Sequence, residues 1–155
     1  MSEISQFSQG LHEECGVFGM YDKTGATDMV SAVYSALYAL QHRGQEACGI
    51  ATINDREQSF YKDVGLVSEM FDKQTLQRLN GTMAVGHVRY ATTGAREREN
   101  AQPLTIKYVK GTLAVVHNGN LVGVDQLRQK FEYQGAIFHT TSDSELIAYA
   151  IAQAR

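Results

Sequence analysis

Proline and cysteine are both scarce in this chain of 155 residues, which contains one proline and two cysteines. Two cysteines cannot build the disulfide framework of a small secreted protein, and the sequence has no Cys-x-x-Cys pair. A reducing, cytoplasmic compartment is therefore expected. No apolar run approaches the roughly 20 residues of a membrane-spanning helix. Residues 1–14 also lack the basic start and apolar stretch of a secretory signal.

An excess of charge of one sign is also missing, because 14 Lys and Arg residues face 17 Asp and Glu residues, for a net charge of −3. This balance disfavours nucleic acid as the main partner. The five histidines show no metal-ligand spacing, and the glycines form no Walker pattern, so we expect neither a metal site nor a triphosphate site. The length suits one domain that buries roughly 68–70% of the surface of its unfolded chain.

Hydrophobic periodicity predicts strands with helices between them. Alternating side chains predict a strand over 15–21, and apolar residues at helical spacing predict a helix over 27–42. Two short apolar segments, 48–53 and 59–62, flank a polar stretch and indicate a hairpin. Further along, we expect a short helix over 72–79, strands over 83–92, 104–109 and 112–119, and an exposed loop over 94–100.

The last third of the sequence predicts two helices. One begins at Asp125 and is stopped by Gly135, and the other begins at a capping box formed by Ser142 and Glu145. The final helix runs to the chain end without a stop signal, so we expect the sequence to be cut within a structural unit. The pattern as a whole predicts an α+β fold with largely antiparallel pairing.

Cys15 is the first candidate for chemistry, because it stands where polar residues 1–14 meet the first predicted strand. One interpretation is a small buried side chain. The alternative is that residues 1–14 are a leader or propeptide whose removal gives Cys15 a free α-amine. That amine, with a reference pKa of about 7.7–8.0, could act as the general base for its own thiol. Removal could follow attack of the thiol on the preceding carbonyl or cleavage by a peptidase.

The pair Asn118-Gly119 has two compatible interpretations. Asn-Gly between apolar runs is a strong hairpin signal. A turn there would also expose the Gly119 N–H beside the Asn118 amide, and two such donors can form an oxyanion hole.

Arg89 and Asp143 are the charged candidates. Arg89 lies in a strand otherwise suited to burial, so it needs a carboxylate partner, supplied either by the core or by a substrate. Asp143 begins the last predicted helix, where it either complements the helix dipole or receives a substrate ammonium group. Together the two residues could hold both charged ends of an amino acid.

Six motifs occur in order and carry a resemblance: CGVFG (15–19), LQHRGQEACGI (40–50), GHVRYATTG (86–94), NAQPL (100–104), HNGNL (117–121) and TTSDSE (140–145). In these the chain resembles the N-terminal glutaminase domain of the amidophosphoribosyltransferase family, whose members are class II glutamine amidotransferases with an N-terminal nucleophile. The resemblance covers 15–155, as an incomplete domain behind the leader 1–14.

The resemblance implies a four-layer αββα sandwich of two antiparallel sheets, truncated here on its C-terminal side. It implies hydrolysis of glutamine to glutamate and ammonia through a Cys15 thioester. The ammonia would pass to phosphoribosyl pyrophosphate in a second domain, giving 5-phosphoribosylamine in the first step of de novo purine (IMP) synthesis. That second domain is absent from the 155 residues.

Carried over residue by residue, the resemblance assigns the nucleophile to Cys15, the oxyanion donors to Asn118 and Gly119, and glutamine binding to Arg89, Thr92 and Asp143. The segment of about 90–102 corresponds to a loop that closes over glutamine. Arg43 lies in the HRGQ motif without an assigned catalytic act.

Cofactors and assembly follow from the resemblance as well. Full-length members use Mg²⁺, and the branch with a leader also holds a 4Fe–4S cluster, with ligands expected beyond residue 155, so this chain alone needs no cofactor. A homo-oligomer, a tetramer in the family, is expected for the full-length protein in the cytoplasm.

Three alternatives stay open on the sequence. The chain could be the glutaminase domain of another class II amidotransferase such as glucosamine-6-phosphate synthase, although the motifs HRGQE and HVRYAT favour the purine enzyme. It could be an inactive interaction fragment with an uncut propeptide and an open sheet edge. A metal hydrolase using His87 and His117 is the third.

Overall fold

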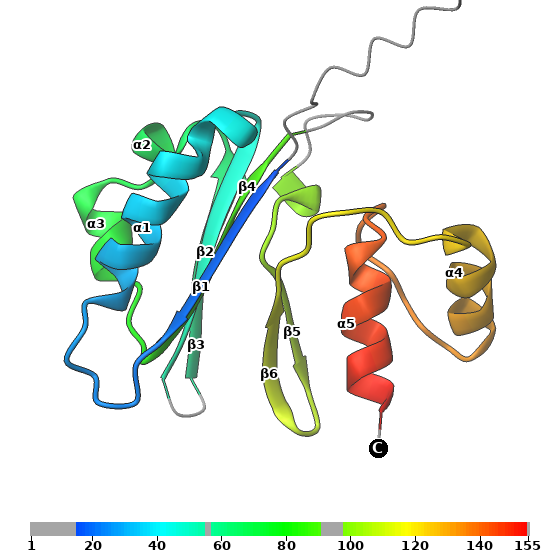
Figure 1. Ribbon diagram of the computed structural model, residues 1–155. Coiled ribbons are helices and arrows are strands. Elements are labelled where there is room, and N and C mark those ends of the chain that lie inside the picture. Colours follow the sequence, from blue (N-terminus) through cyan, green and yellow to red (C-terminus); the bar gives the residue numbers. More distant parts are fainter. Residues whose placement is uncertain (1–14, 55–56, 91–97, 155) are drawn as a thin grey trace, which may run out of the picture.

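The computed structural model describes residues 15–54, 57–90 and 98–154. These residues form four layers, in the order helices, sheet, sheet, helices (Figure 1). None of the helices in these ranges combines the length and hydrophobicity that a membrane crossing demands.

The first sheet has four antiparallel strands in the order β1-β4-β2-β3. The strands are β1 (Gly16–Tyr21), β2 (Ala47–Asn54), β3 (Glu57–Val64) and β4 (Met83–Arg89). The β2–β3 hairpin matches the one that the sequence predicts. The inner strand β4 pairs with β1 on one side and β2 on the other, so that His87 lies opposite Val17 of β1 and Gly49 of β2. This places the start of β1 next to the end of β4.

Helices cover the outer face of this sheet. They are α1 (Met29–Leu40), continued by the short 3-10 helix η1 (Gln41–Arg43), and the short helices α2 (Val67–Met70) and α3 (Lys73–Gln77). Val33 and Leu37 of α1 are fully buried in the first core cluster. A Cβ at Gly86 of β4 would lie 2.7 Å from Val33 Cγ1 and 2.8 Å from Leu37 Cδ1, so glycine allows α1 to approach the strand closely.

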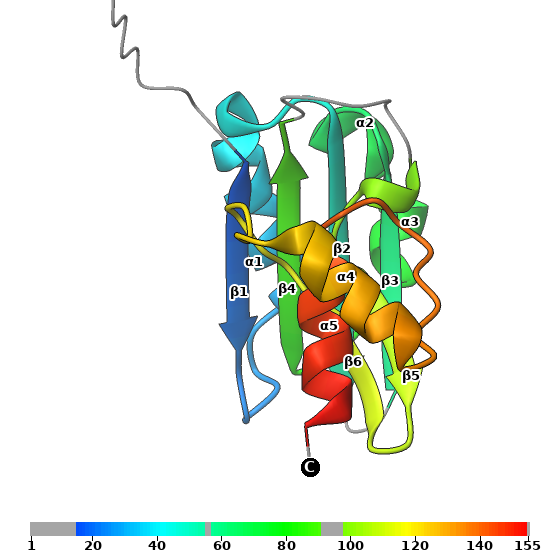
Figure 2. The same ribbon diagram turned by 90° about the vertical axis from the view of Figure 1, so that its right-hand side faces the viewer.

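The second half of the chain forms the other two layers. The 3-10 helix η2 (Arg98–Asn100) leads to the hairpin of β5 (Leu104–Tyr108) and β6 (Gly111–Val115), which α4 (Val124–Tyr133) and α5 (Ser144–Gln153) follow. Figure 2 shows α4 and α5 in front of the hairpin. Leu146 of α5 is fully buried and packs with Phe131 of α4 in a second core cluster. The site lies between the two clusters.

The layer order agrees with the prediction, but three local expectations were wrong. The strand expected over 112–119 ends at Val115, and the chain after Asn118-Gly119 continues into α4 rather than into a partner strand. The Asn-Gly pair is therefore not a hairpin turn; β5 and β6 are joined at 109–110 instead. Ser142 and Glu145 do not form a capping box either, because the Glu145 carboxylate accepts from the N–H groups of His139 and Thr140.

Candidate active site

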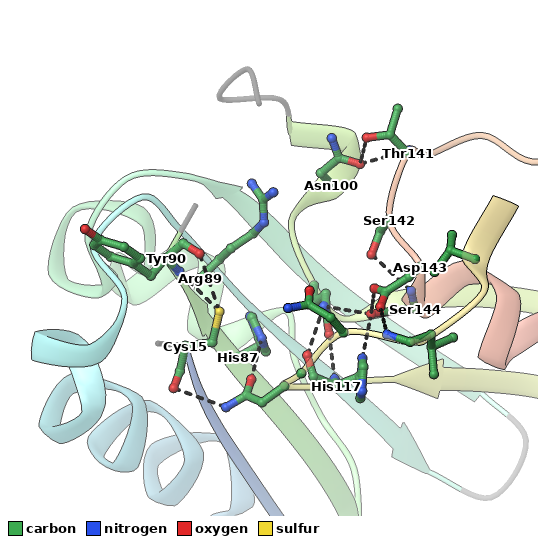
Figure 3. Close-up of a pocket in the computed structure, with 16 residues that line it drawn as sticks. Cys15, His87, Arg89, Tyr90, Asn100, His117, Thr141, Ser142, Asp143 and Ser144 are labelled. Carbon is green, nitrogen blue, oxygen red and sulfur yellow. Dashed lines mark hydrogen bonds between the residues drawn. The ribbon is translucent and has the colours of Figure 1, made fainter. Parts of the chain in front are cut away.

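A cavity of about 400 Å³ lies where the ends of the two sheets meet (Figure 3). Its wall combines the start of β1, the end of β4, the segment between η2 and β5, the segment after β6 and the beginning of α5. Five of the six residues predicted for the site line it: Cys15, Arg89, Asn118, Gly119 and Asp143. The sixth, Thr92, lies outside the described residues, as does most of the predicted closing loop.

Cys15 is held through its main chain and its thiol. The Tyr90 N–H donates to Sγ over 3.3 Å, and the Cys15 carbonyl accepts from Arg43 Nε and Asn118 Nδ2, each at 3.1 Å. Its φ of +29° is uncommon for a residue with a side chain. Such strain persists only where the surroundings fix the backbone, and the two donors on the carbonyl supply that restraint.

Arg43 is a site contact that sequence reasoning missed. The residue is 28 positions from Cys15 and ends η1, and its guanidinium donates to the Cys15 carbonyl. A basic residue in the last turn of a helix is expected for dipole reasons alone. The local sequence therefore does not predict a contact with Cys15. Only the HRGQ motif, which the chain shares with the family that it resembles, draws attention to Arg43.

Asn118 and Gly119 lie beside the Cys15 main chain, although they are about 100 residues away in sequence. Asn118 Nδ2 donates to the Cys15 carbonyl and Oδ1 lies 3.0 Å from His87 Nε2. Gly119 has a φ of +123°, which a side chain would strain. Its N–H has no hydrogen-bond partner among the described residues. One amide hydrogen of Asn118 and the Gly119 N–H thus remain available to a ligand.

Arg89 has the core carboxylate that the sequence offered as one of its two partners. Its Nη1 lies 3.1 Å from Glu46 Oε1, and the two side chains are 19% and 9% exposed. One contact uses only part of a guanidinium with five N–H donors. Because Arg89 also lines the cavity, a planar, positively charged donor edge remains at the site.

Asp143 supplies a negative charge to the same cavity. It precedes α5 as the N-cap residue, but its side chain caps no N–H of that helix. Instead, Oδ2 accepts from the Leu121 N–H at 2.7 Å, and Oδ1 lies 3.4 Å from Ser144 Oγ. The site therefore contains a guanidinium from β4 and a carboxylate from the start of α5.

The Asn118-Gly119 segment is fixed by a buried amide. The Gln102 side chain accepts from the His117 N–H at 2.7 Å and donates to the His117 carbonyl at 3.2 Å, in the manner of a strand partner. Gln102 Nε2 also lies 3.3 Å from Ser144 Oγ, and His117 Nδ1 lies 3.1 Å from the same hydroxyl. This network ties the segment after β6 to the start of α5.

The two other groups of interest are His87 and Cys48. Burial lowers the pKa of His87 to about 4, despite a hydrogen bond with Asn118 that raises it, so the ring is neutral near pH 7. Burial in β2 raises the pKa of the Cys48 thiol to about 12, which keeps it protonated. Among the described residues no group of three or more His, Cys, Asp or Glu side chains is placed to hold a metal ion.

Comparison with known proteins adds a family and several relatives. A family model described as a glutamine amidotransferase domain matches residues 70–154. The chain is 45% identical over 139 residues to an amidophosphoribosyltransferase of Methanocaldococcus jannaschii, covering 90% of this chain and 29% of that protein. A relative of the same name from Synechocystis is 50% identical over 141 residues, covering 90% of this chain and 28% of the relative. The chain thus spans less than a third of these relatives.

Solved structures show the same arrangement. Glutamine phosphoribosylpyrophosphate amidotransferase from Bacillus subtilis, complexed with ADP and GMP, matches with a TM-score of 0.79 and 42% identity, over 89% of this chain and 29% of that one. A structure described as the allosteric regulatory enzyme of purine biosynthesis matches with a TM-score of 0.82, also at 42% identity, over 89% of this chain and 29% of that one. The two antiparallel sheets with flanking helices are therefore those of the N-terminal-nucleophile fold that the sequence predicted.

Proposed function

Because the chain belongs to the glutamine amidotransferase domain family, we propose that it hydrolyses glutamine to glutamate and ammonia with Cys15 as the nucleophile. The main support is the hydrogen bond of 3.1 Å between Asn118 Nδ2 and the Cys15 carbonyl. Both residues line a cavity that Arg89 and Asp143 also line. It brings a thiol, an amide donor and two opposite charges to one place. These are the groups that hydrolysis of an amino-acid side-chain amide requires.

The chemistry begins once residues 1–14 are removed. The free α-amine of Cys15 takes the thiol proton, and the sulfur attacks the glutamine carboxamide carbon. The second amide hydrogen of Asn118 and the Gly119 N–H stabilise the resulting oxyanion. The C–N bond then breaks, and the ammonium of Cys15 gives its proton to the departing nitrogen. Ammonia is released, and the glutamyl group stays bound to Cys15 as a thioester. Water, deprotonated by the same amine, releases glutamate and restores the thiol.

The charged residues orient the substrate. The free edge of the Arg89 guanidinium binds the glutamine α-carboxylate, and the Asp143 carboxylate accepts from the α-ammonium. Thr92 belongs to the same binding set in the proposal. Opposite charges at two points fix the direction of the amino acid, so that its carboxamide lies toward Cys15.

Covalent labelling tests this proposal. A diazoketone analogue of glutamine should alkylate one thiol per chain, and peptide mapping should place the label on an N-terminal Cys15. Cys15→Ala should abolish both labelling and glutamine hydrolysis. The matched control is Cys48→Ala, which removes the only other thiol and should retain both. Active protein that keeps residues 1–14, or processed protein that never reacts, would contradict the mechanism; the second result would favour an interaction fragment.

The proposal extends to the longer protein that such relatives represent. Ammonia from this domain would displace pyrophosphate from phosphoribosyl pyrophosphate and form 5-phosphoribosylamine, the first step of purine synthesis. The support is that the relatives reported above carry the name amidophosphoribosyltransferase. Full-length protein should release pyrophosphate only when glutamine or ammonia is present. Amination of fructose 6-phosphate instead would assign the chain to glucosamine-6-phosphate synthesis.

Cofactors and assembly complete the proposal. A 4Fe–4S cluster needs four thiolates, whereas the chain has two cysteines, one proposed as nucleophile and one buried in β2. The described residues thus do not fit a cluster, and we place its ligands, and those of Mg²⁺, beyond residue 155. The full-length protein is proposed to be a cytoplasmic homo-oligomer, a tetramer as in the family.

A further inference from the structure

His87 is fully buried on the face of β4 that also carries Arg89 two residues later. Its Nε2 lies 3.0 Å from Asn118 Oδ1, a contact between the first sheet and the segment after β6. Figure 3 shows the ring near Cys15, and both residues line the cavity. The sequence suggests His87 only as one of the two histidines of a metal hydrolase, and that alternative does not explain its contact with Asn118.

The geometry fixes which atoms donate. Asn118 Nδ2 donates to the Cys15 carbonyl, so the opposite end of that amide, Oδ1, faces His87. An amide oxygen accepts only, and His87 Nε2 must therefore carry a hydrogen. His87 Nδ1 is then the bare nitrogen of a neutral ring; it is buried and has no hydrogen-bond partner among the described residues. The ring keeps one acceptor unsatisfied while its single hydrogen goes to Asn118.

We propose that His87 is a positioning residue for glutamine hydrolysis, because its Nε2–H holds the Asn118 amide with the nitrogen end toward the oxyanion. The inference rests on the proposed function. Without this donor the amide could rotate by half a turn and present its oxygen to the developing negative charge. A repulsive acceptor would then replace a stabilising donor at the same point. His87 thus acts through Asn118 and touches no reacting atom.

Two substitutions at one position separate the hydrogen bond from the packing. His87→Met fills a similar volume without a donor, whereas His87→Gln places an amide N–H at about the reach of Nε2. In full-length protein, we expect His87→Met to lower kcat for glutamine hydrolysis about 10- to 100-fold, below the 10²–10³ measured for loss of a complete oxyanion donor. The KM for glutamine should stay within about two-fold, because Arg89 and Asp143 are untouched, and His87→Gln should recover most of kcat.

A double-mutant cycle provides the decisive measurement. In an Asn118→Ala background, His87→Met should cause no further loss of kcat, since the group that it positions is gone. An equal loss in both backgrounds, or a rise in KM with kcat unchanged, would overturn the inference. The concentration of active enzyme is measured by titrating the Cys15 thiol with the diazoketone analogue of glutamine. Because kcat is calculated from this concentration, unfolded protein does not affect it.

Two controls keep the result interpretable. If His87→Met does not fold, His87→Asn serves instead: its amide stops short of Asn118, so it should lose activity where His87→Gln retains it, and equal activity of the two would overturn the inference. Glutamine hydrolysis that survives Cys15→Ala would refute the proposed function itself. That outcome is seen before any His87 variant is measured.

Discussion

Arg89 carries a single positive charge and has two carboxylate partners in the proposal, one from Glu46 and one from the substrate. The Glu46 contact at 3.1 Å anchors one end of the guanidinium, and both side chains are largely buried. An anchored arginine loses little conformational freedom when a ligand binds, whereas a free one must be ordered first. We therefore expect Glu46 to prepare Arg89 for the carboxylate of the proposed substrate rather than to compete with it.

Removal of that anchor should weaken substrate binding. We expect Glu46→Ala to raise the KM for glutamine about 10-fold, near the ~1.5–3 kcal/mol of a hydrogen bond to a charged group, with little change in kcat. Glu46→Gln retains an acceptor oxygen and should have a smaller effect. Steady-state hydrolysis over a range of glutamine concentrations measures both. A lower KM in Glu46→Ala would mean that Glu46 competes with the substrate.

His87 also makes stability depend on pH. Its pKa is about 4 in the folded protein and ordinarily 6.5. Between these values the unfolded chain binds more protons, so the free energy of unfolding falls as pH decreases from 6.5 to 4. The loss is about 3 kcal/mol for this shift, at 1.36 kcal/mol per pKa unit. Urea unfolding at pH 7 and pH 4.5 should show a clearly smaller difference for His87→Gln than for wild type; an equal difference would remove His87 as the cause.

At the scale of the elements, β2 makes one of the close contacts between the first sheet and the second half of the chain. A Cβ at Gly49 would overlap the Gln102 carbonyl oxygen and lie 2.9 Å from Pro103 Cδ. Glycine therefore lets the first sheet approach the segment that carries Gln102. Because the Gln102 side chain fixes the His117 main chain, this approach also sets the position of Asn118 and Gly119.

A pair of alanine substitutions tests this contact. Gly49→Ala should destabilise the protein by about 1–3 kcal/mol, the usual cost of overpacking, and lower kcat by displacing Gln102. Gly19→Ala in β1 is the matched control, since its nearest neighbour would be Val85 Cγ1 at an ordinary 3.4 Å. Urea unfolding and glutamine hydrolysis are measured for both. Equal behaviour of the two variants would show that the close approach at Gly49 has no special role.

Elements were predictable where the signal is local. Alternating side chains identified β1, the apolar, β-branched composition of its segment identified β4, and the polar break between two apolar runs identified the β2–β3 hairpin. The order β1-β4-β2-β3 was not readable from periodicity, because pairing between distant strands leaves no mark in either strand. The end of β6 was missed because Asn118-Gly119 has the composition of a hairpin turn, while its conformation is set by Gln102 from outside the segment.

The site residues divide in the same way. The candidate roles came from the position of Cys15 at the start of the first strand, from the charge of Arg89 in a strand suited to burial, and from the place of Asp143 at the start of the last helix. The family resemblance supplied the rest. The contacts of Arg43 and His87 needed the structure, because each depends on a partner about 30 residues away. Buried polar residues in strands are most often satisfied by the core, so their composition alone does not distinguish support from catalysis.

In the whole molecule, the proposed reaction takes place between two halves of the chain, each of which has its own hydrophobic cluster. His87 and Arg89 belong to the first sheet, which packs on α1, and Cys15 immediately precedes its strand β1. Asn118, Gly119 and Asp143 depend on the second half of the chain, in which Leu146 and Phe131 form a separate hydrophobic cluster. The proposed substrate binding needs both halves, whereas the hydrogen bonds of the Cys15 thiol are made with the Tyr90 main chain. The two functions of the site should therefore respond differently to damage in one cluster.

Leu146→Ala tests this separation, since Leu146 is fully buried in the second cluster. Loss of a buried leucine costs about 2–5 kcal/mol, and the resulting relaxation displaces the start of α5, where Asp143 contacts Leu121. In protein that remains folded, the KM for glutamine should rise several-fold. Alkylation of Cys15 by a small neutral reagent such as iodoacetamide should keep its wild-type rate, because that reagent needs neither Asp143 nor Asn118. A parallel fall in the alkylation rate would mean that the two clusters stabilise the site as one unit.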